Sequence, residues 1–123
     1  MANPNIVNVT SIYGNTSYLI PSTTAATTWT ALTPATNTIN KIDNIVAANV
    51  TGSIATVTVS INSAAAGAGT AYRLIYQVPV PINASIVIVD KSTAFYLGEA
   101  QSVVVTVGTA SAIELTASYE AIT

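Results

Sequence analysis

Apolar and polar residues alternate along much of this chain, and the alternation predicts β-strands. The clearest case is residues 54–61, in which every second residue from Ala55 to Ile61 is apolar and Thr or Ser stands between them. Successive side chains of a strand point to opposite faces of the sheet. This segment therefore predicts a strand with one face packed on a hydrophobic core.

The last third of the chain repeats this pattern and organises the prediction. Three β-branched, apolar runs occupy residues 86–89, 103–107 and 113–119, and short polar or Gly-containing stretches separate them. Such runs are typical of antiparallel strands that pack one face on a core. Between two of them, residues 95–99 (FYLGE) predict a tight turn with its aromatic side chains beneath the sheet.

The first half of the chain is less regular. Residues 5–12 predict a first strand, and Tyr13-Gly14-Asn15 predicts a turn, because Gly and Asn tolerate positive φ. Residues 38–50 carry apolar residues near helical spacing, but their β-branched side chains and internal Asn residues favour a strand over residues 41–49. We expect this strand to pair as a hairpin with residues 54–61, which follow it directly.

The middle of the chain predicts one more strand and a loop. Residues 62–70 (NSAAAGAGT) are small and polar and predict a hairpin loop or mobile tip. Residues 71–78 predict a strand, which Pro79 and Pro81 interrupt. Because proline cannot donate to a ladder, the two prolines mark a sheet edge or a crossover.

About eight strands in a chain of 123 residues predict one all-β domain, an antiparallel β-sandwich of jelly-roll-like or immunoglobulin-like form. Strand alternation does not distinguish the two topologies. We divide the chain into residues 1–20, an N-terminal arm or first strand, and residues 21–123, the sandwich domain.

Charge is scarce in this sequence. Only 7% of its residues are charged, three cations and five anions give a net charge of −2, and half of the residues are hydrophobic. Three scattered cations cannot neutralise a row of phosphates, so we expect no binding to nucleic acid. No apolar run approaches 18 residues, and the N-terminus lacks the pattern of a secretory signal, so we expect no membrane span and no such signal. Low charge with much apolar surface favours association with partners.

The side-chain inventory offers little for catalysis. The chain has no His and no Cys, which removes the commonest metal ligands and nucleophile pairs. Glu114 and Glu120 stand six residues apart, on the order of 20 Å along a strand, which is too far for a glycosidase pair. Asp90-Lys91 and the Lys41/Asp43 pair predict local ion pairs or turn residues. We therefore expect no enzymatic activity, no cofactor and no metal site.

Aromatic and apolar residues are the remaining candidates for function. Trp29, the single tryptophan, predicts a core or interface anchor. A docking arm at the N-terminus, whose alternative is an ordinary first strand, would contact partners through a set of apolar and aromatic residues: Ile6, Val7, Val9, Ile12 and Tyr13. A third possibility is a carbohydrate- or receptor-binding module with Trp29, Tyr72 and Tyr76 as its platform. An exposed aromatic cluster beside residues 62–70 would favour this module.

Three stretches give the sequence a resemblance to a family: ANPNIVNVTSIYG at the start, KIDNIVAANVTGSIATVTVSI in the middle, and SIVIVDKSTAFYLGEAQSVVVTV…ELTASYEAI at the end. Together they resemble small virion structural proteins of tailed bacteriophages, notably marine and cyanobacterial phages. Those proteins often carry a turn of the type I-Y-L-x-E-G-D-S and end in S-Y-E-x-I. Here the corresponding segments read FYLGEAQS (residues 95–102) and SYEAI (residues 118–122), so one acidic residue of the turn is missing.

The resemblance covers most of the chain and implies a non-enzymatic role in the virion. It also implies that the protein is in the host cytoplasm during assembly and in the virion afterwards. It implies a capsid decoration or cement protein whose first expected partner is the major capsid protein, and which forms a homo-oligomer, with a trimer as one possible form. The alternative within the same resemblance is a structural subunit of the neck, the tail or a fibre attachment.

Overall fold

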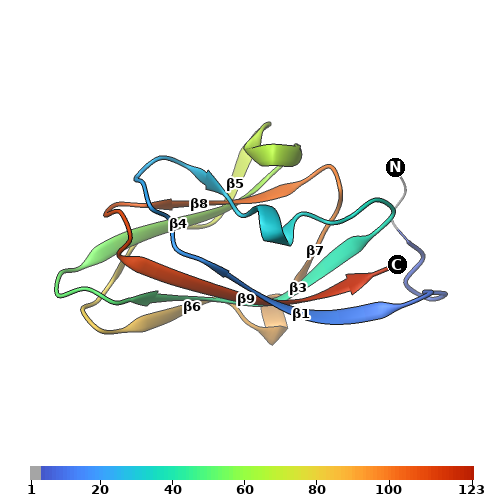
Figure 1. Cartoon of the computed structure of the whole chain (residues 1–123), viewed down its shortest axis with the longest axis horizontal. Coiled ribbons are helices and arrows are strands. Elements are labelled where there is room, and N and C mark those ends of the chain that lie inside the picture. Colours follow the sequence, from blue (N-terminus) through green and yellow to red (C-terminus); the bar gives the residue numbers. More distant parts are fainter. Residues whose placement is uncertain (1–3) are drawn as a thin grey trace.

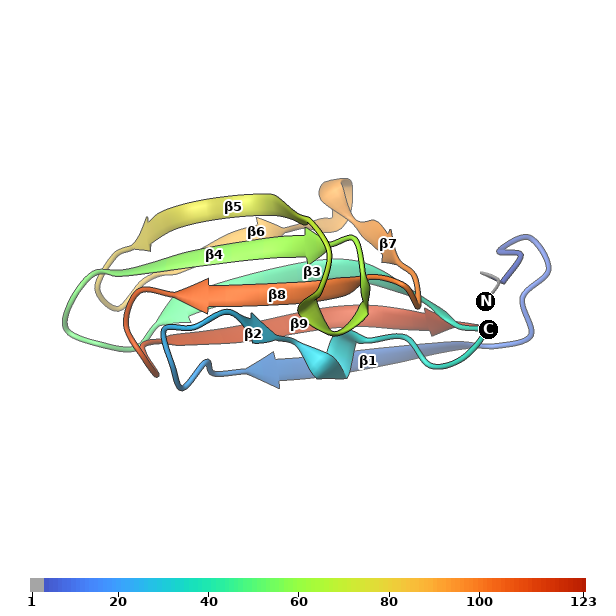
Figure 2. The same cartoon turned by 90° about the horizontal axis from the view of Figure 1, so that it is seen from above.

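The computed structural model describes residues 4–123, which form a β-sandwich of two antiparallel sheets packed face to face (Figures 1 and 2). No residue in this range belongs to an α-helix. The strands are β1 (Ile12–Leu19), β2 (Thr27–Thr28), β3 (Ile39–Asn49), β4 (Ala55–Asn62), β5 (Ala71–Val80), β6 (Ser85–Val89), β7 (Phe95–Leu97), β8 (Ser102–Val107) and β9 (Ile113–Ile122). Three short 3-10 helices connect them: η1 (Thr30–Leu32), η2 (Ala65–Gly67) and η3 (Lys91–Thr93).

The order of the strands is that of a jelly roll. One sheet, sheet A, runs β1-β9-β3-β6, with the short β7 also paired to β3, and the other, sheet B, runs β2-β8-β4-β5. If β7 is left out and the other eight strands are numbered in chain order, sheet A has the order 1-8-3-6 and sheet B has the order 2-7-4-5. The predicted all-β sandwich is therefore confirmed, and the strand order selects the jelly-roll form.

The core lies between the two sheets and consists of the inward-facing side chains of both. In the first half of β9 the buried residues are Ile113, Leu115 and Ala117, and exposed Glu114 and Thr116 stand between them. Strand β8 buries its whole apolar run from Val103 to Val105 because the η2 loop covers its outer side. Burial of such side chains stabilises the fold by about 1.5–3 kcal/mol each.

The regular strands lie where the sequence pattern predicts them. Strands β3, β4, β6, β8 and β9 each coincide with a predicted strand to within a few residues. Strand β5 continues through Pro79, which pairs with Thr56 of β4. Because β5 is the edge strand of sheet B, one side of it has no partner and can accommodate a residue without an N–H.

The predicted first strand is wrong in its position. Residues 5–8 form a turn instead, in which the backbone N–H of Asn8 donates to the carbonyl of Asn5 and that of Val7 donates to the Asn5 side chain, both at 3.0 Å. The strand begins at Ile12 and includes Tyr13-Gly14-Asn15, which the sequence predicts as a turn. Pairing of all eight residues with β9 outweighs the local turn preference of Gly and Asn.

The predicted hairpin between residues 41–49 and 54–61 is also wrong. Strand β3 belongs to sheet A and β4 to sheet B, so the connection crosses from one sheet to the other. Buried Asn49 holds this connection: its Nδ2 donates to the carbonyls of Ser53 at 2.7 Å and Val80 at 3.0 Å, and its Oδ1 accepts from the N–H and hydroxyl of Thr51. The alternation predicts which face of each strand is buried but not the sheet to which the strand belongs.

Two shorter predictions differ from the structure as well. Residues 95–97 form β7 along β3 instead of a tight turn, and Tyr96 is exposed on it while Leu97 is buried. The loop at residues 62–70 connects β4 to β5, and it folds back over sheet B. There the Ser102 hydroxyl donates to the Ala64 carbonyl and accepts from the N–H of Gly67, at 2.8 and 2.9 Å. These bonds hold the loop against the sheet, so it is not a free tip.

Candidate interaction surfaces

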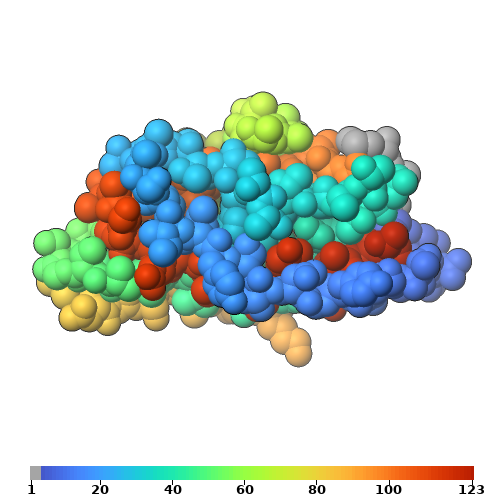
Figure 3. Space-filling view, viewed as in Figure 1, coloured from blue at the N-terminus to red at the C-terminus, as the bar shows by residue number. Residues whose placement is uncertain are grey.

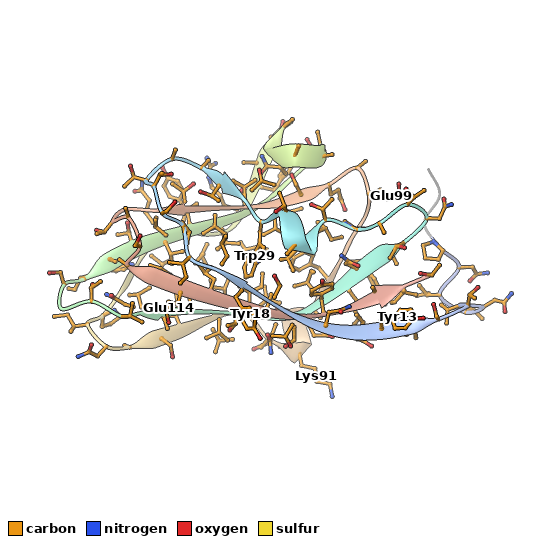
Figure 4. All side chains as sticks on the ribbon, in the orientation of Figure 1. Tyr13, Tyr18, Trp29, Lys91, Glu99 and Glu114 are labelled. Atoms are coloured by element: carbon orange, nitrogen blue, oxygen red, sulfur yellow. The ribbon has the colours of Figure 1, made fainter. Side chains whose placement is uncertain are left out.

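The ionisable side chains are dispersed over the surface. Among residues 4–123, no three or more His, Cys, Asp or Glu side chains lie close enough to hold a metal ion together. Lys91, Glu99 and Glu114 lie at separate places on the molecule (Figure 4). The Glu99 carboxylate accepts a hydrogen bond from the backbone N–H of Asn37 and so has a local structural partner. Within the same described range, no helix is long and apolar enough to cross a bilayer.

One pair of carboxyl groups meets on the outer face of sheet A. Glu120 pairs in register with Lys41, and the Lys41 Nζ lies 3.9 Å from the Asp43 carboxylate. A hydrogen bond with Asp43, followed by partial burial and by repulsion from the same carboxylate, raises the pKa of Glu120 above its ordinary value, and Lys41 opposes the shift. Glu120 therefore keeps its proton to a higher pH than an ordinary glutamate, although it lies on an open sheet face.

Asp90 has a structural role at the start of η3. Its side chain accepts hydrogen bonds from the backbone N–H groups of Ser92 and Thr93, and the Thr93 hydroxyl accepts from the N–H of Asp90, which completes a capping box. Hydrogen bonds from Ser92, first from its hydroxyl and then from its backbone, lower the pKa of Asp90. Asp90 therefore stabilises a turn and does not form an ion pair with Lys91.

Trp29 is part of the core and is not available to a partner. Its side chain is 1% exposed and lies between the two sheets (Figure 4). The indole N–H donates to the buried Ser17 hydroxyl at 3.0 Å, which ties the segment after β2 to β1. Of the two interpretations of Trp29, the core anchor agrees with this burial, whereas a platform formed with Tyr72 and Tyr76 does not.

The N-terminal candidates lie at the edge of sheet A. Residues 1–3 fall outside the described range. Ile6 and Val7 are exposed, Val9 is half-buried, and Ile12 and Tyr13 are exposed on β1. The part of the proposed arm from Ile12 onward is therefore a strand of the sheet, and the backbone of Ser11 is bonded in both directions to Thr123.

Tyr72 and Tyr76 project from the opposite edge of the molecule, on β5. They are 65% and 59% exposed, and the guanidinium of Arg73 lies 5.0 Å from the centre of the Tyr76 ring. Strand β5 follows the 62–70 loop directly, so the structure places exposed aromatic residues where the sequence predicts a binding platform, without Trp29. The Arg73 guanidinium covers one face of the Tyr76 ring.

A cleft of about 320 Å³ opens between β1 and the segment that leads into β3. Its walls include Tyr13 and Asn15 of β1, Asn40 of β3 and Tyr119 of β9. Two of its polar groups already have partners inside the chain: the Asn40 amide donates to the Leu32 carbonyl at 2.8 Å, and the Tyr119 hydroxyl donates to the Ala31 carbonyl at 3.2 Å. These bonds hold η1 in place, so two polar groups of the cleft wall are already used within the chain.

Sequence reasoning missed several exposed apolar side chains that extend these surfaces. Tyr18 on β1 and Val87 on β6 are 73% and 63% exposed, and both lie on the outer face of sheet A. The apolar run at residues 86–89 gives no sign that Val87 faces outward, because alternation is lost where both neighbours are also apolar. For Tyr18 the signal appears only once the true strand boundaries are known.

Comparison with known proteins adds no relative: no protein-family model, no curated protein and no solved structure matches the chain. The candidate surfaces therefore rest on their own geometry.

Proposed function

We propose that this protein is a non-enzymatic structural component of a tailed-phage virion that decorates or cements the capsid surface through protein–protein contacts. Its partners would be the major capsid protein and further copies of itself. The observation that carries the proposal is the character of its surface: among residues 4–123, exposed large apolar and aromatic side chains outnumber the charged ones. Surfaces of this kind mark sites of association.

Three further features support the proposal. The jelly roll recurs in viral capsid proteins and also in lectins, so the fold is compatible with the role but does not fix it. The resemblance of the start, the middle and the last forty residues to small phage virion proteins adds the phage context. The uncharged β1 edge and the exposed tyrosines of β5 lie at different edges of the sandwich, so one subunit offers two surfaces for contact.

The experiment is a binding titration of the purified protein onto capsids assembled without it. Saturable binding at a fixed ratio to the major capsid protein supports the decoration role. Binding confined to the portal end or to isolated tails would instead support a neck or tail subunit. Two matched variants, Tyr18→Ser on β1 and Tyr76→Ser on β5, would show which of these two surfaces contacts the capsid.

The exposed tyrosines of β5 favour one second candidate, a carbohydrate-binding module. Aromatic faces stack on sugars, and Tyr72 is free of the guanidinium that covers one face of Tyr76. In this case Tyr72→Ser would abolish binding to an oligosaccharide array, while capsid binding would stay unchanged. An array without any bound sugar would remove this candidate.

A further inference from the structure

Strand β1 is an open sheet edge that lacks the usual protection against pairing with another chain. All eight of its residues pair with β9 in one unbroken register. The strand has no proline, no charged side chain and no residue with positive φ. Natural edge strands are usually blunted by charges, prolines, bulges or short length, because a regular open edge is a template for another strand.

The other edges of the sandwich carry such protection. Strand β2 has only two residues. Strand β5 carries Arg73 and Pro79, its register with β4 shifts twice, and Gln77 within it has a φ of 48°. The edge of sheet A opposite β1 is divided between the short strands β6 and β7, which both pair with β3. Among the described strands, β1 alone therefore presents a long and regular edge.

The pair that directly precedes β1 shows which of its backbone groups point toward β9 and which point to the open edge. Ser11 and Thr123 exchange both backbone bonds, at 3.3 and 2.9 Å, so they form a hydrogen-bonded pair at the end of the ladder. Such pairs alternate in an antiparallel ladder. The N–H and C=O groups of Ile12, Gly14, Thr16 and Tyr18 therefore point away from β9 to the open edge, and the space-filling view shows β1 as an uncovered band along one side (Figure 3).

The charge distribution indicates what pairs with this edge. No charged side chain precedes Lys41 in the sequence. Strands β1 and β2 lie at the same side of the sandwich (Figure 2), and neither carries an ionised side chain; behind them, Glu120 of β9 pairs in register with Gly14. A charged partner strand would lose hydration at this edge without meeting a counter-charge on β1 itself. A second copy of the same neutral edge avoids this cost.

We propose that two copies of this chain pair through β1, antiparallel and about a twofold axis at Asn15, so that one sheet continues through both. This position of the axis pairs all four residues whose backbone N–H and C=O groups point to the open edge. Ile12 then pairs with Tyr18 of the second copy, and Gly14 pairs with Thr16 of the second copy. Exposed Ile12 and Tyr18 then form two aromatic–aliphatic pairs on the outer face. Pairing of identical antiparallel strands requires a twofold axis, so this surface makes a dimer and not a trimer.

The first test is the mass of the protein in solution by sedimentation equilibrium over a range of concentrations. The parent protein is expected at twice its chain mass of 12.6 kDa. Thr16→Glu places two glutamates beside the axis, each separated from Glu120 of the other copy only by Gly14, and is expected to raise the dissociation constant at least about tenfold. The control is Thr116→Glu, which puts the same charge on the same outer face one strand further in and leaves the dimer intact.

The second test fixes the register and does not depend on a charge variant that folds. Because the chain has no cysteine, Asn15→Cys introduces one thiol that meets its symmetry mate across a non-hydrogen-bonded pair, with Cα atoms about 4.5 Å apart, within disulfide range. Asn15→Cys should form a disulfide dimer under mild oxidation several-fold faster than Thr16→Cys or Thr116→Cys. Equal rates in all three variants, or a parent protein that is monomeric at high concentration, would overturn the proposal. This inference stands on the edge geometry, so its failure would leave the capsid-binding proposal to its own test.

Discussion

The hydrogen bond between Trp29 and Ser17 gives the sharpest stability prediction. The indole N–H and the Ser17 hydroxyl are 3.0 Å apart, and the two residues are 1% and 7% exposed. Ser17→Ala leaves the indole donor buried without a partner, which costs about 1–3 kcal/mol. The total free energy of unfolding of such a domain is about 5–15 kcal/mol, so this loss is a large fraction of its stability.

The single tryptophan provides the assay, because its fluorescence reports unfolding at the site itself. In a urea titration with a slope of about 2 kcal/mol per molar, a loss of about 2 kcal/mol lowers the midpoint by about 1 M. The control is Ser85→Ala, an exposed serine at the start of β6, for which we expect a change within about 0.5 kcal/mol. Protein concentration must be equal in all titrations, since dimerisation would add to the apparent stability.

A double-mutant cycle separates the bond from the packing of the ring. Trp29→Phe removes the indole donor but keeps an aromatic ring, and unfolding is then followed by circular dichroism. Ser17→Ala combined with Trp29→Phe should cost less than the sum of the two single variants, by a coupling of about 0.5–3 kcal/mol. Equal midpoints for Ser17→Ala and Ser85→Ala, or strictly additive costs, would refute the claim that this bond closes the sandwich between β1 and the segment after β2.

Three further predictions concern the core, the crossover and the acid pair. Leu115→Asp should abolish folding, because a buried unpaired charge costs several kcal/mol, whereas Thr116→Asp on the exposed face should melt close to the parent in calorimetry. Asn49→Ala should lower the free energy of unfolding by more than about 2 kcal/mol, because it removes the buried bond to the Val80 carbonyl and leaves the Thr51 N–H without its acceptor; a loss under about 0.5 kcal/mol would contradict its role in the crossover. The pKa of Glu120 is raised in the folded state, so its contribution to stability is present below the ordinary value of 4.5 and is lost as the pH rises through the folded pKa. Glu120→Gln should therefore gain stability relative to the parent with rising pH in urea titrations, and Asp43→Asn should remove the same pH dependence. Parallel pH profiles for all three proteins would contradict the raised pKa of Glu120.

The regular strands could be predicted because burial on one face leaves a pattern that local sequence carries. In β4 the residues between Ala55 and Ile61 alternate without a break, and the structure buries the predicted face at Ala55, Val57 and Val59. In β1 the sequence IYGNTSYL contains Gly and Asn within the strand, so local propensity favours a turn. The partner that makes it a strand is β9, about a hundred residues away, and no local pattern contains that information.

The neighbours of each strand were not predictable for a related reason. The short link after Asn49 is compatible both with a hairpin and with a crossover between sheets, and the two arrangements bury the same faces. The buried hydrogen bonds of Asn49 appear only in the folded chain. Whether an edge is open depends on the same sheet order, so sequence reasoning could propose an N-terminal docking element but could not identify β1 as an unprotected edge.

The measurement that tests the proposed virion role most directly is the number of copies of this chain in purified particles of a phage found to carry its gene. Quantitative mass spectrometry relative to the major capsid protein gives this number, and labelled antibodies in cryo-electron images give its position. The proposed decoration role predicts hundreds of copies distributed over the head. About a dozen copies at the portal end would contradict decoration in favour of a neck or tail subunit, and complete absence from the particles would contradict the virion role itself.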